Sequence, residues 1–128
     1  MLQAYAYVLH LLSAFVLLAL FFIIYTKITP FEEIPLIRTG NVAAALSLGG
    51  AMLGFGLALV SSILHNDTFF LFLAWAGGSM VVQAMAYAVL ARIVPNMDEA
   101  IEANNIAMGM LMGTTSVLVG MINAACLS

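Results

Sequence analysis

Acidic residues gather in two short segments of a sequence that is otherwise almost free of charge. Five of the six Asp and Glu residues are Glu32, Glu33, Asp98, Glu99 and Glu102. Grouped carboxylates attract cations and basic proteins through their electric field. The second group also lies where a helix is expected to start, and the helix dipole favours carboxylates there. Three interpretations stay open: a cation-attracting vestibule, a docking patch for a basic partner, or solvated loops and helix starts.

Few other side chains could carry chemistry. His10 and Gln83 are the polar residues placed deepest in apolar segments, and an ionisable residue inside a membrane is a functional candidate by default. His10 is also close enough to its segment's end to be a neutral interfacial histidine. Cys126 is expected to pack among apolar side chains. Because no nucleophile accompanies a base and no metal-ligand spacing occurs, the sequence predicts no enzyme, metal or cofactor. No nucleic-acid partner is expected.

Long apolar segments surround these polar groups. Hydrophobic residues make up 65% of the 128 residues and charged residues 7%, whereas a soluble domain has about 25% charged residues. Segments 2–25, 41–64, 69–91 and 105–127 contain no Lys, Arg, Asp or Glu, and each exceeds the roughly 20 residues that span a bilayer as a helix. They lack the alternation of barrel strands. The sequence therefore predicts one all-α transmembrane domain, residues 1–128, in a lipid bilayer.

The second half of the chain resembles the first. Asn41 aligns with Asn105, and Pro30 aligns with Pro95 after a gap of one residue. Matching Asn, Gly and Pro residues favour a duplication over chance alignment of apolar helices. We predict a four-helix bundle made of two tandem hairpins in a parallel repeat, with repeat one at 1–64 and repeat two at 69–128.

The three basic residues predict the orientation in the membrane. Lys27 and Arg38 lie in the loop between the first two segments, and Arg92 starts the loop between the last two. The positive-inside rule places both longer loops in the cytoplasm and both termini outside. Tyr25 and Phe31 are expected at the cytoplasmic interface, where aromatic side chains are enriched. Residues 97–103 are expected to form a helical start that continues into the last segment.

Small residues concentrate in the second and fourth apolar segments, where they let helix backbones approach closely in lipid. They are Gly49, Gly50, Gly54, Gly56, Gly109, Gly113 and Gly120. This surface could pack within one chain, or part of it could join subunits of a homo-oligomer. Asn41 and Asn105 stand where the two segments begin, either as N-caps or as partners in an interhelical hydrogen bond between the repeats.

These residues resemble the YjfL family of small four-span bacterial inner-membrane proteins, a domain of unknown function. The matching stretches include residues 25–30, Glu33, Asn41 and Gly50 in the first half. In the second half they include Asn105, Ala107, residues 109–110, residues 112–114 and residues 123–126. The resemblance implies an inner-membrane protein with a duplicated hairpin. It also implies an association with phage-shock-type membrane-binding proteins and polyamine-related enzymes, beside whose genes family members occur.

Two functions remain as hypotheses. The first is a non-enzymatic integral membrane component of an envelope-stress or membrane-integrity system, which docks a peripheral cytoplasmic membrane-binding protein through its acidic loops. The alternative is a small oligomeric ion channel or transporter, in which the same loops form a cation-attracting vestibule. A pathway would need several subunits around an axis, because the four segments offer few polar side chains to line it.

Overall fold

A computed structural model describes residues 2–128, which form six helices and no strand. The helices are α1 (Leu2–Ile28), α2 (Glu33–Arg38), α3 (Val42–His65), α4 (Phe69–Ile93), α5 (Met97–Glu102) and α6 (Ile106–Leu127). The long helices α1, α3, α4 and α6 are each long and apolar enough to cross a membrane. The prediction of an all-helical transmembrane fold is confirmed.

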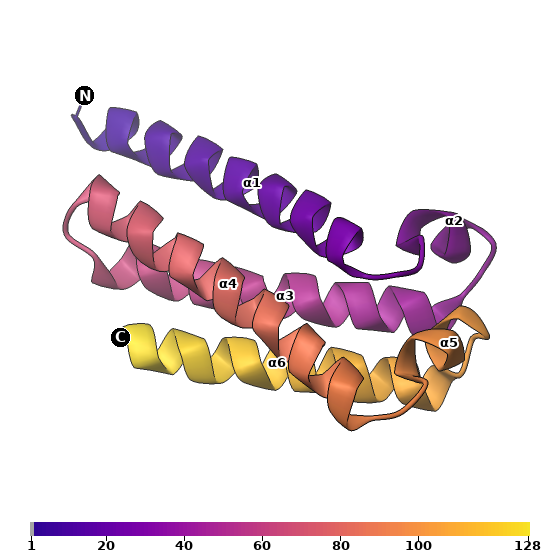
Figure 1. Cartoon of the computed structure of the whole chain (residues 1–128). Coiled ribbons are helices and arrows are strands. Elements are labelled where there is room, and N and C mark those ends of the chain that lie inside the picture. Colours follow the sequence, from indigo (N-terminus) through magenta and orange to yellow (C-terminus); the bar gives the residue numbers. More distant parts are fainter. Residues whose placement is uncertain (1) are drawn as a thin grey trace.

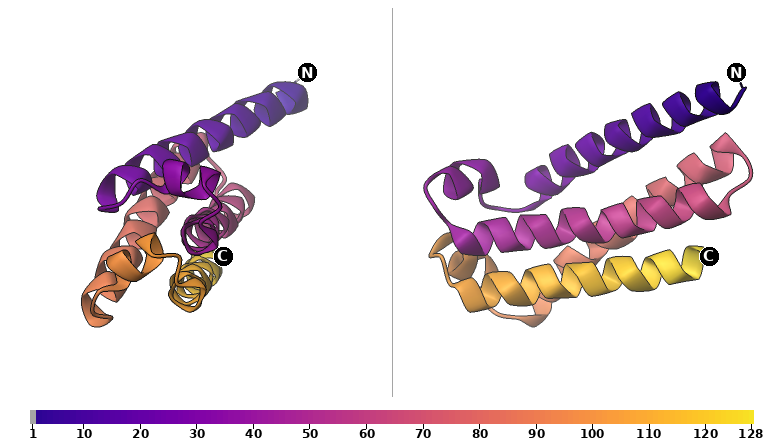
Figure 2. Two further views of the ribbon diagram at one scale, coloured as in Figure 1. Left: turned by 90° about the vertical axis from the view of Figure 1, so that its right-hand side faces the viewer. Right: turned by 180° about the vertical axis from the view of Figure 1, so that it is seen from behind.

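The four long helices run side by side, and each end of the bundle has its own set of connections (Figure 1). Both termini and the turn between α3 and α4 lie at one end, called the termini end below. The short helices α2 and α5 lie at the other end, called the short-helix end (Figures 1 and 2). Residues 97–103 do not run into the last long helix as predicted, because Asn104 turns the chain with a φ of 62° after α5 ends.

The helices α3 and α6 form the most extensive pair, and they run parallel. Ala43 lies against Gly109 near the start of both helices, and the Ser61 hydroxyl donates to the Ala124 carbonyl at 2.6 Å near their ends. Helix α4 packs against both. Helix α1 touches α3 and α4 mainly in its second half, so that Phe21 and Tyr25 are its only buried residues within the described chain. Its N-terminal half diverges from the bundle (Figure 2).

The core lies where α1 meets α3 and α4. Phe21 of α1 stacks on Phe55 of α3 with ring centroids 4.7 Å apart, and both side chains are fully buried. Phe72 of α4 is also fully buried. The Phe21 and Phe55 rings fill the space between α1 and α3, and Phe72 is buried near the termini end, where it contacts His10. Most apolar side chains of α1 stay exposed, as expected for a helix that faces lipid.

The two halves contain corresponding elements at the short-helix end. Helices α2 and α5 have six residues each. Each is followed by a residue with positive φ, Gly40 at 92° or Asn104 at 62°, and then by an Asn N-cap. The amide of Asn41 donates to the Leu36 carbonyl at 2.9 Å, and the amide of Asn105 donates to the Ala100 carbonyl at the same distance. The same turn therefore leads into α3 and α6.

Candidate functional site

The five clustered acids separate into buried and exposed groups. Glu33, the first residue of α2, is only 2% exposed, and Asp98 in α5 is partly buried. Glu32, the N-cap residue of α2, and Glu99 and Glu102 of α5 are exposed. The expectation that all five form one accessible patch is therefore wrong for Glu33, since a partner protein cannot touch a side chain that is buried under α2.

The Glu33 carboxyl has one close donor. Its Oε1 atom accepts a hydrogen bond of 2.7 Å from the Thr29 hydroxyl, while its Oε2 atom is buried without a hydrogen-bond partner among the described residues. Burial raises the pKa of the Glu33 carboxyl, the Thr29 hydroxyl and the backbone amide of Glu33 itself counteract this in part, and the charge of Asp98 raises the pKa further. Glu33 is thus a carboxyl whose surroundings favour the protonated form.

Two tyrosines lie near this carboxyl. The rings of Tyr25 in α1 and Tyr87 in α4 meet edge to face with centroids 5.5 Å apart. The Tyr87 hydroxyl donates to Asp98 Oδ1 at 2.5 Å. Tyr25 lies near the charges of Glu33 and Asp98, and its hydroxyl is within hydrogen-bonding reach of the Ser47 hydroxyl of α3. We call Glu33, Asp98, Tyr25, Tyr87 and Ser47 the acidic cluster.

Local sequence explains how the acidic cluster forms. Helix α1 ends at Ile28, because Pro30 disfavours helical backbone in the residue before it. Phe31 is 4% exposed and packs in the core. The chain that follows it therefore begins α2 with the Glu33 side chain buried against the long helices. On α5, Met97 and Ile101 are buried, which directs Asp98 toward Tyr87. The cluster therefore combines one residue from each of the five helices α1 to α5.

The sequence did not reveal several of these residues. Tyr25 and Phe31 were expected at the membrane interface, but both are buried, and Tyr25 packs beside Tyr87 of α4. Nothing in the sequence distinguished Tyr87 and Ser47 from the other residues of their apolar segments as members of a site. The spacing of four residues between Thr29 and Glu33 was visible, but only the position of α2 makes that pair buried.

Asn41 has two roles, whereas Asn105 has one. The Asn41 side-chain oxygen accepts from the Ala44 amide at 2.8 Å, and its Nδ2 atom donates to the carbonyls of Ile101 and Glu102 at 2.9 and 3.1 Å. Asn105 caps α6 through the Met108 amide at 3.3 Å. Both N-cap predictions are confirmed, and only Asn41 also reaches into the second half of the chain.

The intramembrane polar residues have structural partners. His10 Nδ1 lies 2.8 Å from the Ala6 carbonyl, and the ring contacts Phe69 and Phe72 at centroid distances of 5.7 and 5.5 Å. The ring borders an open crevice of about 520 Å³ at the termini end. Gln83 Nε2 donates to the Ser116 carbonyl at 2.7 Å, which ties α4 to α6. Cys126 is exposed, so its predicted packing within the chain is wrong.

The glycines divide into contact and open positions. A Cβ atom at Gly50 would meet the backbone of Gly113, and one at Gly120 would meet the backbone of Gly54. The glycines that face α3 or α6 in this way are Gly50, Gly54, Gly109, Gly113 and Gly120. A Cβ atom at Gly49 or Gly56 would have no neighbour within 4 Å. Close packing therefore involves the first group and not the second.

The basic residues all lie outside the core. Lys27 ends α1, Arg38 ends α2 and Arg92 lies in the last turn of α4. All three are exposed, and all belong to the short-helix end (Figure 1). Among the described residues, no group of three or more His, Cys, Asp or Glu side chains could hold a metal ion. The cluster can hold protons or small cations, but it offers no activated nucleophile.

Comparisons with known proteins give the family. The family model described as Domain of Unknown Function (DUF350) matches residues 1–127. The inner membrane protein YjfL of Escherichia coli K12 is 37% identical over 109 residues, which cover 85% of this chain and 83% of that protein. The transmembrane protein YshE of Bacillus subtilis is 26% identical over 110 residues, covering 84% and 82%. No solved structure matches. The chain therefore belongs to the DUF350 family, as an integral inner-membrane protein with four apolar helices.

Proposed function

We propose that this protein is a non-enzymatic membrane component that docks a peripheral basic protein at its short-helix end, within an envelope-stress or membrane-integrity system. One observation carries the proposal: Glu32, just before α2, and Glu99 and Glu102 of α5 are exposed, and both short helices lie at the same end of the bundle (Figure 1). Lys27, Arg38 and Arg92 belong to the same end, and the positive-inside rule then orients that end toward the cytoplasm.

The two short helices are suited to docking because the fold holds them in place. Phe31, Met97 and Ile101 anchor them in the core with exposed fractions of 4% or less. The Asn41 side chain satisfies two carbonyls at the end of α5. A surface that is already ordered loses little conformational entropy when a partner binds. Its exposed carboxylates would guide a basic partner and select against an acidic one.

The proposal is tested by charge reversal in nanodiscs of zwitterionic lipid. A purified phage-shock-type membrane-binding protein is the probe, since the family resemblance implies that partner class. The triple change Glu32→Lys, Glu99→Lys and Glu102→Lys should abolish binding, and salt should weaken wild-type binding because exposed charges are screened. Asp67→Lys at the termini end is the control and should bind normally. Undiminished binding by the triple variant would refute docking at this surface.

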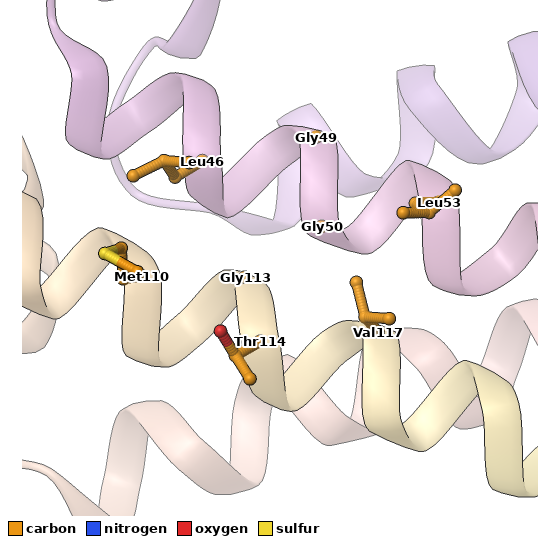
Figure 3. A pocket seen from close by; sticks show the side chains of 8 residues that line it. All are labelled: Leu46, Gly49, Gly50, Leu53, Met110, Gly113, Thr114 and Val117. Atoms are coloured by element: carbon orange, nitrogen blue, oxygen red, sulfur yellow. The ribbon is translucent and has the colours of Figure 1, made fainter.

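The second candidate function is a small oligomeric channel or transporter. A groove of about 340 Å³ on the outer side of α3 and α6 favours it (Figure 3). Its lining residues are Leu46, Gly49, Gly50, Leu53, Met110, Gly113, Thr114 and Val117. A Cβ atom at Gly49 would have no neighbour within 4 Å. Small residues on a lipid-facing surface allow a helix of another subunit to approach.

Ion flux separates the two candidates. Purified protein in liposomes should conduct no cations if docking is its function. Conduction without any partner, altered by the triple charge reversal at Glu32, Glu99 and Glu102, would instead support the channel and reject docking. The Gly49→Leu variant should then also lose conduction, because a bulky side chain in the groove would block subunit contact.

A further inference from the structure

We propose that the acidic cluster binds one exchangeable monovalent cation, which is a proton on Glu33 or an alkali-metal ion that competes with it. The proposal goes beyond docking, because it uses the buried carboxyl that no partner protein can touch. It rests on three features of the cluster: the absence of a basic partner, the presence of an unpartnered carboxyl oxygen, and a connection to the surface.

The first feature is the missing countercharge. Glu33 is faced by Tyr25 from α1, Tyr87 from α4 and Asp98 from α5, with the Thr29 hydroxyl as hydrogen-bond donor. None of the charge effects on Glu33 comes from a basic residue among those the structure describes. A buried carboxylate without an opposite charge is strongly unfavourable. Glu33 must therefore carry a proton or have a cation beside it.

The second feature is a buried carboxyl oxygen without a partner. Glu33 Oε2 is buried and has no hydrogen-bond partner in the described chain, whereas the Tyr25 and Ser47 hydroxyls, also buried, lie close enough to interact with each other. The three residues are each 2% exposed or less. Buried polar atoms are normally satisfied, so unsatisfied ones point to a bound group. Carboxylate and hydroxyl oxygens suit a hard cation such as an alkali-metal ion.

The third feature is a route to the surface. Asp98 lies on α5 at the short-helix end (Figure 1) and is only partly buried, so this residue reaches the surface there. Tyr87 donates to its Oδ1 atom at 2.5 Å and thereby holds it beside the cluster. A charge on Asp98 also raises the affinity of Glu33 for a proton. Glu33 is thus the inner site, and Asp98 is the more exposed carboxyl of the cluster.

Infrared difference spectroscopy in nanodiscs tests the proposal directly. The wild-type protein minus Glu33→Gln should show the carbonyl stretch of a protonated carboxyl at pH values above 4.5, where an ordinary glutamate has lost its proton. The band should disappear as pH rises. The neighbouring change Glu32→Gln is the matched control, and it should leave the band intact because Glu32 is exposed. At fixed pH, sodium or potassium chloride should weaken the band if an alkali ion competes, whereas choline chloride should not. Insensitivity to all salts assigns the site to the proton alone.

Thermal stability gives a second readout. A raised pKa means that the folded protein holds the Glu33 proton more tightly than the unfolded chain does. The stabilising contribution is therefore present below the ordinary pKa of 4.5 and is lost as pH rises through the raised value. Over this range the unfolding temperature of the wild type should fall relative to that of Glu33→Gln, which cannot titrate.

A second variant keeps the test independent of Glu33 replacement. Asp98→Asn removes the charge that raises the Glu33 pKa, so the band should disappear at a lower pH than in the wild type. The proposal is overturned if no protonated carboxyl is assigned to Glu33 at any pH, or if its band is unaffected by both pH and salt. Identical pH dependence of unfolding in the wild type and Glu33→Gln would also overturn it.

Discussion

Adding one methyl group at Gly50 should destabilise the protein, while the same change at the adjacent Gly49 should not. A Cβ atom at Gly50 would lie far inside 3.0 Å of the Gly113 backbone, which real Cβ atoms essentially never approach. The obstacle is backbone, so no side chain can rotate to relieve it. A Cβ atom at Gly49 would have nothing within 4 Å. Both glycines lie in the same turn of α3, which makes them a matched pair.

The magnitude follows from two terms. Replacing Gly by Ala inside a helix gains about 0.8–1.0 kcal/mol of helix propensity, and this gain applies equally to both positions. Only Gly50→Ala also forces α3 and α6 apart, and overpacking of this kind costs about 1–3 kcal/mol. Because the propensity term cancels between the variants, the difference between their unfolding free energies should be about 1–3 kcal/mol. Gly49→Ala should be neutral or slightly stabilised.

The assay is reversible unfolding of purified protein in mixed micelles, with increasing denaturing detergent and circular dichroism as the readout. A second matched pair repeats the comparison one turn further along α3. A Cβ atom at Gly54 would lie 2.7 Å from Gln83 Nε2 and even closer to the Ser116 carbonyl, whereas one at Gly56 would be unobstructed. Equal free energies for Gly49→Ala and Gly50→Ala, and again for the second pair, would refute the close contact of α3 with α6.

Two further predictions concern the N-caps and the orientation. Asn41→Ala should cost more than Asn105→Ala in the same unfolding assay, by roughly 1–3 kcal/mol, because only Asn41 adds two hydrogen bonds to α5 beyond its cap, at about 1 kcal/mol each. Equal losses would show that those two bonds contribute nothing. In a Cys126→Ala background, an impermeant thiol reagent applied to intact cells should label Asp67→Cys and not Glu32→Cys. The reverse labelling would invert the predicted topology.

The membrane-spanning helices were predictable because bilayer thickness alone requires long uninterrupted apolar segments. The ends of these helices were less predictable. Helix α1 continues to Ile28 and α4 to Ile93, since Lys27 and Arg92 remain helical beyond the apolar segments. The repeat at 1–64 and 69–128 stays a prediction, as does the homo-oligomer. The corresponding turns at Gly40 and Asn104 are consistent with duplication.

The glycine pattern identified the correct pair of helices but not the contact face. Spacing places Gly49 and Gly50 one residue apart, which turns their Cα atoms about 100° from each other around a helix with 3.6 residues per turn. Either could face α6, and the sequence offers nothing that chooses between them. The way in which α3 and α6 pack decides which glycine is at the contact: Gly50 faces Gly113, and Gly120 faces Gly54.

The same difficulty explains why the acids could not be separated by sequence. Glu32 and Glu33 are chemically alike and adjacent, so composition and charge count assign them the same role. Their environments differ because α2 begins at Glu33 and turns its side chain beneath the bundle, where the Thr29 hydroxyl meets it. Pro35 gave no indication of a six-residue helix around it, although proline is tolerated in the first turn. The position of that one short helix decides which carboxyl faces solvent and which is buried with two tyrosines.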